Sequence, residues 1–455
     1  GASRTRLVTL HATTIADNRP LVPGGNIPVQ SLTMGVGTIL EARRVVMLAL
    51  GEHKRSIVRA AVEGPVTNEV TASFLQNHSA AIAVLDTAAA GDLTRVHAPW
   101  LLGPLALRGG QWTDALVRQA VIWLAHEADK AILKLEDGDY AQHGLEELLT
   151  HGGSAYELNL RVFRSLQATV SGWPAGRPAE GQAKPAPRRV LVFSPHPDDD
   201  VISMGGTLAR LCAQGHEVHV AYQVSGANAV SRDFMARQLD FVRESAGVLG
   251  VTRVPADIDQ VPLEQRRELA AAVRRAEARS AASVAGVPAA RCHFLNLPFY
   301  ERPDRRTDAA DVTIIRELLA SLQPTQIYAA GDLADPHGTH RICLELLEAA
   351  IRAEQTAGVA WVKACEGWLY RGAWDDWRAH EIDRAIPLSP AEVLLKLRAI
   401  LRHQSQKDET PFLGGDAREF WQRAEARTQA AAEVYRKLGW AEYAALETLA
   451  RWPVL

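Results

Sequence analysis

The stretch from Arg189 to Gly215 reads RVLVFSPHPDDDVISMGGTLARLCAQG. Its first residues are apolar and rich in valine, which predicts a short strand that ends at the Pro-His-Pro triplet. The residues after the aspartates have the pattern of a helix, and Gly215 is placed where it would end that helix. The next segment, EVHVAYQ, predicts a second strand. The stretch therefore predicts a strand, a helix and a strand in succession.

The same order of elements returns further along the chain. The segment RCHFLNLP predicts a strand, VTIIRELLASLQ predicts a helix, and TQIYAAG predicts another strand. Strands that alternate with helices in this way are typical of an α/β fold with a mostly parallel, doubly wound sheet. In such a sheet, ligands bind beyond the carboxyl ends of the strands. We therefore expect a functional site where the strands end.

Histidine and aspartate residues gather where the first of these strands is predicted to end. His196 is followed closely by Asp198, Asp199 and Asp200. A single carboxylate, Asp200, would cap the helix and stabilise it by about 0.3–1 kcal/mol. Three carboxylates in succession repel one another, and a divalent cation would turn that repulsion into attraction. The cluster therefore favours a metal site over capping alone.

A second cluster follows the strand predicted from TQIYAAG. It contains Asp335, His337 and His340 and leads into a predicted helix. A single histidine is more often a surface residue or a satisfied buried residue than a ligand. Two such clusters at the ends of two strands of one sheet nevertheless predict a shared metal site in one cleft.

The types of side chain in the two clusters narrow the choice of metal. Two imidazoles and one carboxylate suit zinc, or iron, manganese or cobalt in the same pocket, whereas calcium and magnesium prefer oxygen ligands. Three protein ligands leave one position open for water, which is typical of a catalytic site. A further carboxylate is then available to take a proton, and a further histidine to stabilise an oxyanion or protonate a leaving amine.

The motif FSPHPDDDVISMGGTLARL, from Phe193 to Leu211, resembles the signature of the PIG-L/LmbE-like family of zinc-dependent N-acetylglucosaminyl deacetylases and related amidases. The resemblance extends over roughly 189–438. It implies a Rossmann-like deacetylase domain in which His196, Asp199 and His340 bind Zn²⁺ or another divalent transition metal. It also implies that Asp198 is the general base and that His337 is the electrophilic or acid histidine.

The chain departs from the pattern of this family at two positions. Asp200 stands where many members have glutamate, and Thr339 stands where many have aspartate before the ligand histidine. HQSQ, from His403 to Gln406, is similar to the C-terminal helix motif of the family. Tyr300 and Arg302 follow a predicted strand and are candidates for substrate binding in the sugar pocket, with ordinary loop residues as the alternative.

The first hundred residues resemble a different family. ASRTRLVTLHATTIADNR, from Ala2 to Arg19, and the stretches 32–78 and 80–86 are similar to the C-terminal half of glucosamine-6-phosphate deaminases. By position, Arg19 and Lys54 match phosphate-contacting residues of that family, and a guanidinium with an ammonium suits a sugar phosphate. Surface ion pairing is the alternative for each. The phosphate loop, the proton-abstracting aspartate and the ring-opening histidine of the family precede this stretch, so we expect an incomplete deaminase/isomerase-like α/β domain in a fragment of a longer fusion.

The pattern of composition divides the 455 residues into four parts. We predict the deaminase-like domain at 1–104, a helical extension at 105–170, a linker rich in Pro, Gly and Ala at 171–188, and the deacetylase domain at 189–455, whose C-terminal part is largely helical. The net charge is −3 and charges of both signs are interspersed, which disfavours a nucleic-acid or membrane surface. Four cysteines without a CxxC pair favour a reducing cytoplasm.

The leading functional hypothesis is metal-dependent hydrolysis of the N-acetyl amide of an amino sugar, N-acetylglucosamine or its 6-phosphate. One alternative is a glucosamine-6-phosphate deaminase that needs further N-terminal residues. Another is a non-catalytic sugar-phosphate sensor. The expected partner is a small-molecule amino sugar, and homo-oligomer formation is compatible with the sequence.

Overall fold

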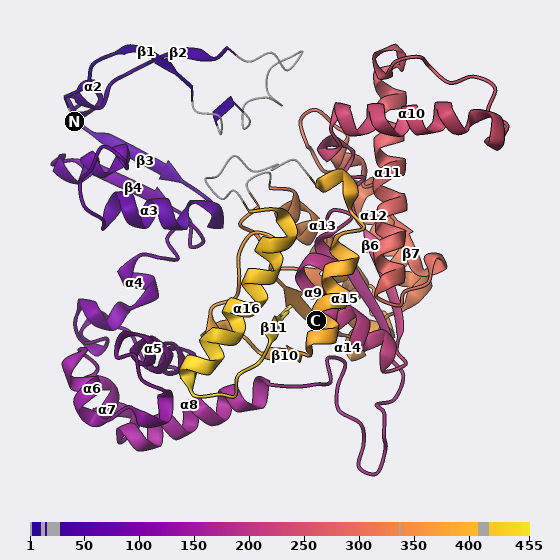
Figure 1. Cartoon of the computed structure of the whole chain (residues 1–455). Helices are drawn as coiled ribbons and strands as arrows, with labels where there is room; N and C mark the ends of the chain where they lie inside the picture. The colour runs from indigo at the N-terminus through magenta and orange to yellow at the C-terminus, as the bar shows by residue number, and fades with distance from the viewer. Residues whose placement is uncertain (1, 11–13, 16–27, 336–337, 408–417) are drawn as a thin grey trace.

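A seven-stranded sheet lies at the centre of the C-terminal part of the chain in the computed structural model, which describes residues 2–10, 14–15, 28–335, 338–407 and 418–455 (Figure 1). Its strand order is β10-β11-β9-β8-β5-β6-β7. The five strands from β7 to β9 pair in parallel, and β11 runs antiparallel to both β9 and β10. The strands are β5 (Arg189–Ser194), β6 (Glu217–Tyr222), β7 (Cys292–Phe294), β8 (Gln326–Ala330), β9 (Glu366–Tyr370), β10 (Arg384–Leu388) and β11 (Ala445–Arg451). The predicted α/β class with a mostly parallel sheet is confirmed.

Helices cover both faces of this sheet, and strand β5 shows why. Val190 and Val192 pack into one hydrophobic core, whereas Leu191 and Phe193 pack into another. Successive side chains of a strand point to opposite faces, so an uninterrupted apolar strand requires a cover on each side. The first core includes residues of α9 (Asp199–Ala213), α11 (Leu263–Val284), α15 (Pro390–Ile400) and α16 (Phe420–Leu438). The second includes residues of α12 (Ala309–Leu322), α13 (Thr339–Thr356) and α14 (Ala360–Ala364).

Strands β9, β10 and β11 are not among the elements predicted from the sequence. They are mixed in composition, with Pro387 inside β10 and Glu447 inside β11. Strand β11 follows the predicted C-terminal helices and inserts between β9 and β10. The antiparallel end of the sheet therefore depends on pairing between distant segments.

The first hundred residues form two small sheets and short helices. Strands β1 (Arg6–Thr9) and β2 (Gln30–Thr33) pair antiparallel, and β3 (Val45–Ala49) and β4 (Ala81–Leu85) pair in parallel. The α-helices in this part are α2 (Val36–Leu40), α3 (Arg55–Val62) and α4 (Thr94–His97). Val58 of α3 belongs to a small core that includes Ala49 and Leu85 at the ends of the two strands. We call residues 2–104 the N-terminal segment.

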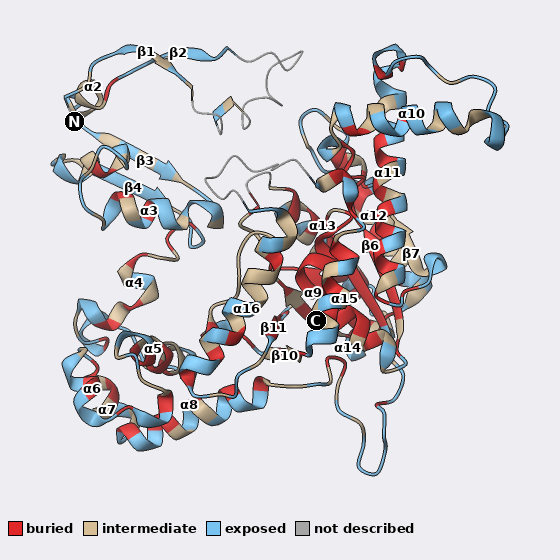
Figure 2. Cartoon of the chain, in the orientation of Figure 1, coloured by how far each residue is buried: buried red, intermediate tan, exposed pale blue. Residues whose placement is uncertain are grey.

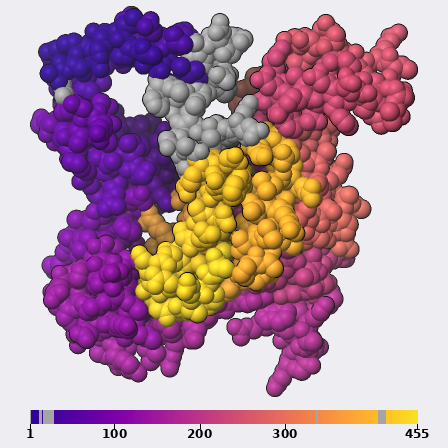
Figure 3. Space-filling view, viewed as in Figure 1, coloured from indigo at the N-terminus to yellow at the C-terminus, as the bar shows by residue number. Residues whose placement is uncertain are grey.

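The predicted helical extension forms a core of its own. Its helices are α5 (Asp114–Glu127), α6 (Asp137–Gln142), α7 (Glu146–Gly152) and α8 (Ala155–Thr169). Their core also includes Trp100, Ala379 and Leu438, so it contacts parts of the chain on either side in sequence. Figure 3 shows these helices beside the C-terminal helix α16.

Residues 171–188 contain no helix or strand, and their first part is held against the sheet. The carbonyl of Pro174 accepts a hydrogen bond of 2.9 Å from the Tyr328 hydroxyl, and Ala175 is buried in the first sheet core. The divisions at 104, 170 and 188 stay a prediction. Among the described residues, none of the helices combines the length and apolar character that a membrane span requires.

Candidate metal centre and active site

Two loops at the carboxyl ends of neighbouring strands bring three candidate ligands together. His196 follows β5 and Asp199 begins α9, whereas His340 lies in the first turn of α13, after β8. One ligand atom from each of these residues lies within 4.8 Å of the others. Strands β5 and β8 pair in parallel, so their carboxyl ends lie at the same edge of the sheet. The two predicted clusters therefore meet in one place.

The distances within this group are short and the side chains are largely buried. His196 Nδ1 lies 3.3 Å and His340 Nε2 lies 3.2 Å from the same atom, Asp199 Oδ2. His340 is 1% exposed and Asp199 is 4% exposed, while His196 is half-buried. His340 Nε2 is buried and, apart from its approach to Asp199, has no hydrogen-bond partner among the described residues. Its surroundings fit a ligand atom for a cation.

The electrostatics of the group favour a positive charge beside Asp199. Burial by itself raises the pKa of Asp199, but His340 and His196 outweigh it and hold that pKa well below its ordinary value. Burial lowers the pKa of His340, but Asp199, Asp335 and Asp332 outweigh it and raise that pKa to about 10. Both shifts arise because a buried carboxylate attracts positive charge. A divalent cation supplies that charge with the imidazoles neutral.

The orientation of His340 is set by its second ring nitrogen. His340 Nδ1 lies 3.1 Å from the carbonyl oxygen of Asp332, which can accept a hydrogen bond from Nδ1 only when that nitrogen carries the proton. The other nitrogen, Nε2, is then free to act as a ligand. Gly338, with φ of 69°, precedes α13 and provides the left-handed turn that starts this helix.

Asp198 lies next to the candidate ligands but has a different partner. Its Oδ2 atom is 3.0 Å from Nη2 of Arg274, a residue of α11 that is 1% exposed. Asp198 is the N-cap residue of α9, yet its side chain makes no capping hydrogen bond. Arg274 Nε and Nη1 are buried and make no hydrogen bond within the described part of the chain. Asp198 is thus a carboxylate held by a buried cation beside the ligands.

Asp200 does not join the ligands and does not cap the helix. It is fully buried, and its two oxygens accept hydrogen bonds of 3.3 Å from the hydroxyls of Ser194 and Tyr222. Burial, with the nearby Asp198 next in importance, raises the pKa of Asp200 to about 7. The three aspartates therefore have three different surroundings.

The residues predicted to bind substrate differ in how close they lie to the candidate ligands. Tyr300, in the 3-10 helix η10 (Pro298–Tyr300), has its ring centre 6.1 Å from that of His196 and is 6% exposed. Arg302 instead forms ion pairs with Asp308 and Asp311. Lys54 is exposed at the end of the 3-10 helix η2 (Glu52–Lys54). His337 and Arg19 lie outside the described residues.

Two further residues near Asp198 belong to this region. Arg274 was not predicted, although the residues buried along α11 include Ala270, Arg274 and Glu277 at helical spacing. A charged side chain on the apolar face of a predicted helix is a signal that could have revealed it. His403, of the HQSQ motif, is buried, neither ring nitrogen has a hydrogen-bond partner among the residues described, and burial lowers its pKa to about 3. It is therefore neutral at physiological pH.

Comparison with known proteins agrees with this arrangement. Residues 191–351, which contain the three candidate ligands and Asp198, match the PIG-L family, described as GlcNAc-PI de-N-acetylase. The chain contains a PIG-L domain. The N-terminal segment is similar to glucosamine-6-phosphate deaminases: it is 50% identical to that of Cellvibrio japonicus over 95 residues, which are 21% of this chain and 36% of that protein.

One relative matches nearly the whole chain, across both the N-terminal segment and the PIG-L domain. It is a putative glucosamine-6-phosphate deaminase-like protein of Bacteroides thetaiotaomicron, 44% identical over 447 residues. The match covers 93% of this chain and 66% of the relative, so the chain spans about two thirds of its length. Among solved structures, N,N'-diacetylchitobiose deacetylase from Pyrococcus horikoshii is 20% identical, with a TM-score of 0.39 over 59% of this chain and 84% of that one.

Proposed function

We propose that this chain is a metal-dependent hydrolase that removes the N-acetyl group of an amino sugar. The convergence of His196, Asp199 and His340 beside a separate carboxylate, Asp198, is the observation that supports it. The match of the PIG-L domain to a family described as a GlcNAc-PI de-N-acetylase supports N-acetylglucosamine or its 6-phosphate as the substrate class. Similarity of the N-terminal segment to deaminases of glucosamine 6-phosphate supports the same class of sugar.

In this proposal His196, Asp199 and His340 hold a divalent transition metal, with Zn²⁺ the best fit to two imidazoles and one carboxylate. When bound, such an ion polarises a carbonyl and makes hydroxide available near neutral pH. Asp198 takes the proton of the attacking water on a carboxylate oxygen and then passes it to the leaving amine. Arg274 keeps that carboxylate in place through their ion pair. His337 is assigned to stabilise the developing oxyanion, as the family resemblance implies.

The test is the substitution Asp198→Asn in the full chain loaded with Zn²⁺. The variant should keep its metal, because Asp198 is not a ligand, and should lose acetate release from N-acetylglucosamine by roughly 10²–10⁴-fold. Asp240→Asn on the exposed face of α10 (Arg232–Leu249) is the matched control and should change neither quantity. Full activity of the Asp198 variant would overturn the assignment.

A second candidate function has its own support in the 50% identity of the N-terminal segment to glucosamine-6-phosphate deaminases. Here Lys54 and Arg19 would contact the phosphate of the sugar. Ammonia release from glucosamine 6-phosphate without added metal would favour this function, and acetate release that requires metal would favour the hydrolase. Binding of either sugar without either product would favour a sensor. We also propose a reducing cytoplasmic location, because all four cysteines are free thiols.

A further inference from the structure

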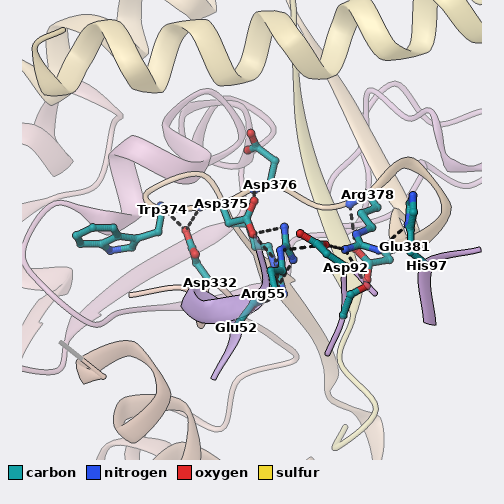
Figure 4. A network of polar contacts seen from close by, with 12 residues as sticks. Glu52, Arg55, Asp92, His97, Asp332, Trp374, Asp375, Asp376, Arg378 and Glu381 are labelled. Atoms are coloured by element: carbon teal, nitrogen blue, oxygen red, sulfur yellow. Dashed lines mark hydrogen bonds and ion pairs between the residues drawn. The ribbon is translucent and has the colours of Figure 1, made fainter. Parts of the chain in front are cut away.

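Ion pairs join the N-terminal segment to the loop that follows β9 of the PIG-L sheet (Figure 4). Arg371 donates to both carboxylate oxygens of Glu52, at 2.7 and 3.2 Å. Arg55 forms an ion pair with Asp375, and Arg378 forms one with Asp92. The side chains in these pairs are between 9% and 26% exposed, so they are shielded from solvent more than ordinary surface pairs. We call residues 371–378 the contact loop.

The contact loop in turn holds Asp332, which lies beyond the end of β8. The backbone amides of Trp374 and Asp375 donate to Asp332 Oδ2 at 2.6 and 3.1 Å. The other oxygen, Oδ1, is buried and makes no hydrogen bond with the residues that the structure describes. A displacement of the contact loop would therefore remove the hydrogen bonds of a carboxylate that is 1% exposed.

Asp332 is also the residue that orients the candidate ligand His340. Its carbonyl oxygen accepts the hydrogen bond from His340 Nδ1, at 3.1 Å. A continuous series of contacts thus leads from Glu52 and Arg55, through the contact loop, to Asp332 and His340. Groups that hold a metal-binding histidine control both its tautomer and its direction, and their loss typically weakens metal binding 10–100-fold.

Close packing around Asp332 leaves the residues of this series of contacts little room to move. The Arg371 guanidinium lies over the ring of Trp377, 4.0 Å from its centre. A Cβ atom at Gly331, the residue before Asp332, would lie 2.9 Å from atoms of both Trp377 and Leu369. The chain at Gly331 is therefore packed directly against the contact loop. A change in the position of Arg371 is expected to reach Asp332, because close-packed side chains transmit displacements.

We propose that Glu52 and Arg55 of the N-terminal segment are positioning residues for the metal centre of the PIG-L domain. Neither residue belongs to the group of candidate ligands. They hold the contact loop, which holds Asp332 and, through it, the imidazole of His340. The inference rests on the proposed function only in taking His340 as a metal ligand. It gives the N-terminal segment a role in the hydrolase that does not require deaminase chemistry.

The experiment measures Co²⁺ affinity and the visible spectrum of the Co²⁺-loaded full chain, with a chelator as competitor. The double substitution Glu52→Gln with Arg55→Gln should weaken Co²⁺ binding roughly threefold to tenfold, less than removal of a direct partner of the ligand. It should also change the intensity of the cobalt bands, which report the ligand geometry. Arg4→Gln with Glu41→Gln, an exposed pair in the same segment, is the matched control and should leave both unchanged.

Two further tests separate positioning from a loss of folding. Arg55→Lys keeps the charge and should recover most of the affinity. In a double-mutant cycle of Arg55→Ala and Asp375→Ala, the two effects on affinity should be non-additive because the residues are direct partners. Additive effects, or affinity and spectrum unchanged in the folded glutamine variant, would overturn the inference. Failure of the unmodified chain to bind about one Co²⁺ would instead overturn the proposed function.

Discussion

Parallel strands of similar composition in two sheets differ sharply in how they are covered. In the PIG-L sheet every residue of β8 is buried, and so are all residues of β5 except the first. In the N-terminal segment β3 and β4 also pair in parallel and are also rich in Val, Leu and Ile. Yet Val46, Leu48, Ile82 and Val84 are 57%, 66%, 46% and 47% exposed. Figure 2 shows the difference as buried residues around α9 and β6 and exposed residues along β3 and β4.

The difference lies in the covering layers. The PIG-L sheet has helices on both faces, whereas the small core beside β3 and β4 has four buried residues, Val58 of α3 with Ala89, Ala90 and Leu93. Apolar strands therefore do not form a closed core by themselves, since each face needs a second layer. The candidate metal centre lies at the carboxyl ends of β5 and β8, two inner strands of the covered sheet, so its ligands are held on rigid elements. Lys54, the candidate phosphate contact, is an exposed residue of the N-terminal segment, whose strands are poorly covered.

The largest expected effect that tests the difference between the PIG-L sheet and the N-terminal segment is the loss of bound metal. His340→Ala should remove metal from the loaded chain and lower acetate release by at least the ~10²–10³-fold expected for loss of one charge-stabilising group. Lys54→Ala should leave the metal content unchanged and alter deacetylation much less. Metal analysis of dialysed protein together with an acetate assay measures both. Metal retained by the His340 variant would contradict the assigned centre.

A matched pair of leucine substitutions compares the stability of the two sheets. Leu191→Ala, at a position of β5 that is 0% exposed, should lower the free energy of unfolding by about 2–5 kcal/mol. Leu48→Ala, at a position of β3 that is 66% exposed, should change it by no more than about 0.5 kcal/mol. Urea unfolding followed by circular dichroism measures both. Equal losses would show that the face of β3 and β4 is covered in solution.

The smallest expected effect concerns pH at the junction between the regions. Burial lowers the pKa of His380 to about 4, with Glu381 opposing this and Arg378 and His97 adding to it. The unfolded chain has a histidine pKa of about 6.5, so the neutral form favours folding above that pH. This stability is lost as the pH falls from about 6.5 towards 4.

The substitution His380→Gln isolates this contribution. Between pH 6.5 and 4, the free energy of unfolding of the variant should fall less steeply than that of the unmodified chain. Because His380 is partly exposed, we expect a difference on the order of 1 kcal/mol. Thermal unfolding at several pH values measures it. Parallel curves for the two proteins would contradict the assigned shift.

Much of the PIG-L sheet could be predicted from the sequence. Strands β5, β6, β7 and β8 and helices α9 and α12 lie where the apolar runs and helical patterns predict them. Strands β9 to β11 could not be predicted in the same way. Their residues gain order by pairing with strands distant in sequence, and Pro387 and Glu447 interrupt the apolar pattern.

The candidate site was predictable to a different degree for each residue. His196, Asp199 and His340 stand in motifs, and the structure brings them together. Arg274 stands in no such motif, and its proximity to Asp198 depends on how α11 packs against the sheet. Glu52, Arg55 and Arg371 are charged residues without any motif. In the sequence they cannot be told apart from ordinary surface residues.

The alternation of strands and helices and the placement of His and Asp residues at two strand ends follow from the amino-acid sequence, because they depend on periodicity and on neighbours along the chain. The position of β8 beside β5, which brings His340 to Asp199, depends on the packing of the whole domain. The contact of the N-terminal segment with the loop supporting Asp332 likewise depends on tertiary packing. Contacts between residues far apart in the sequence depend on how whole elements pack, and local sequence patterns do not predict that packing.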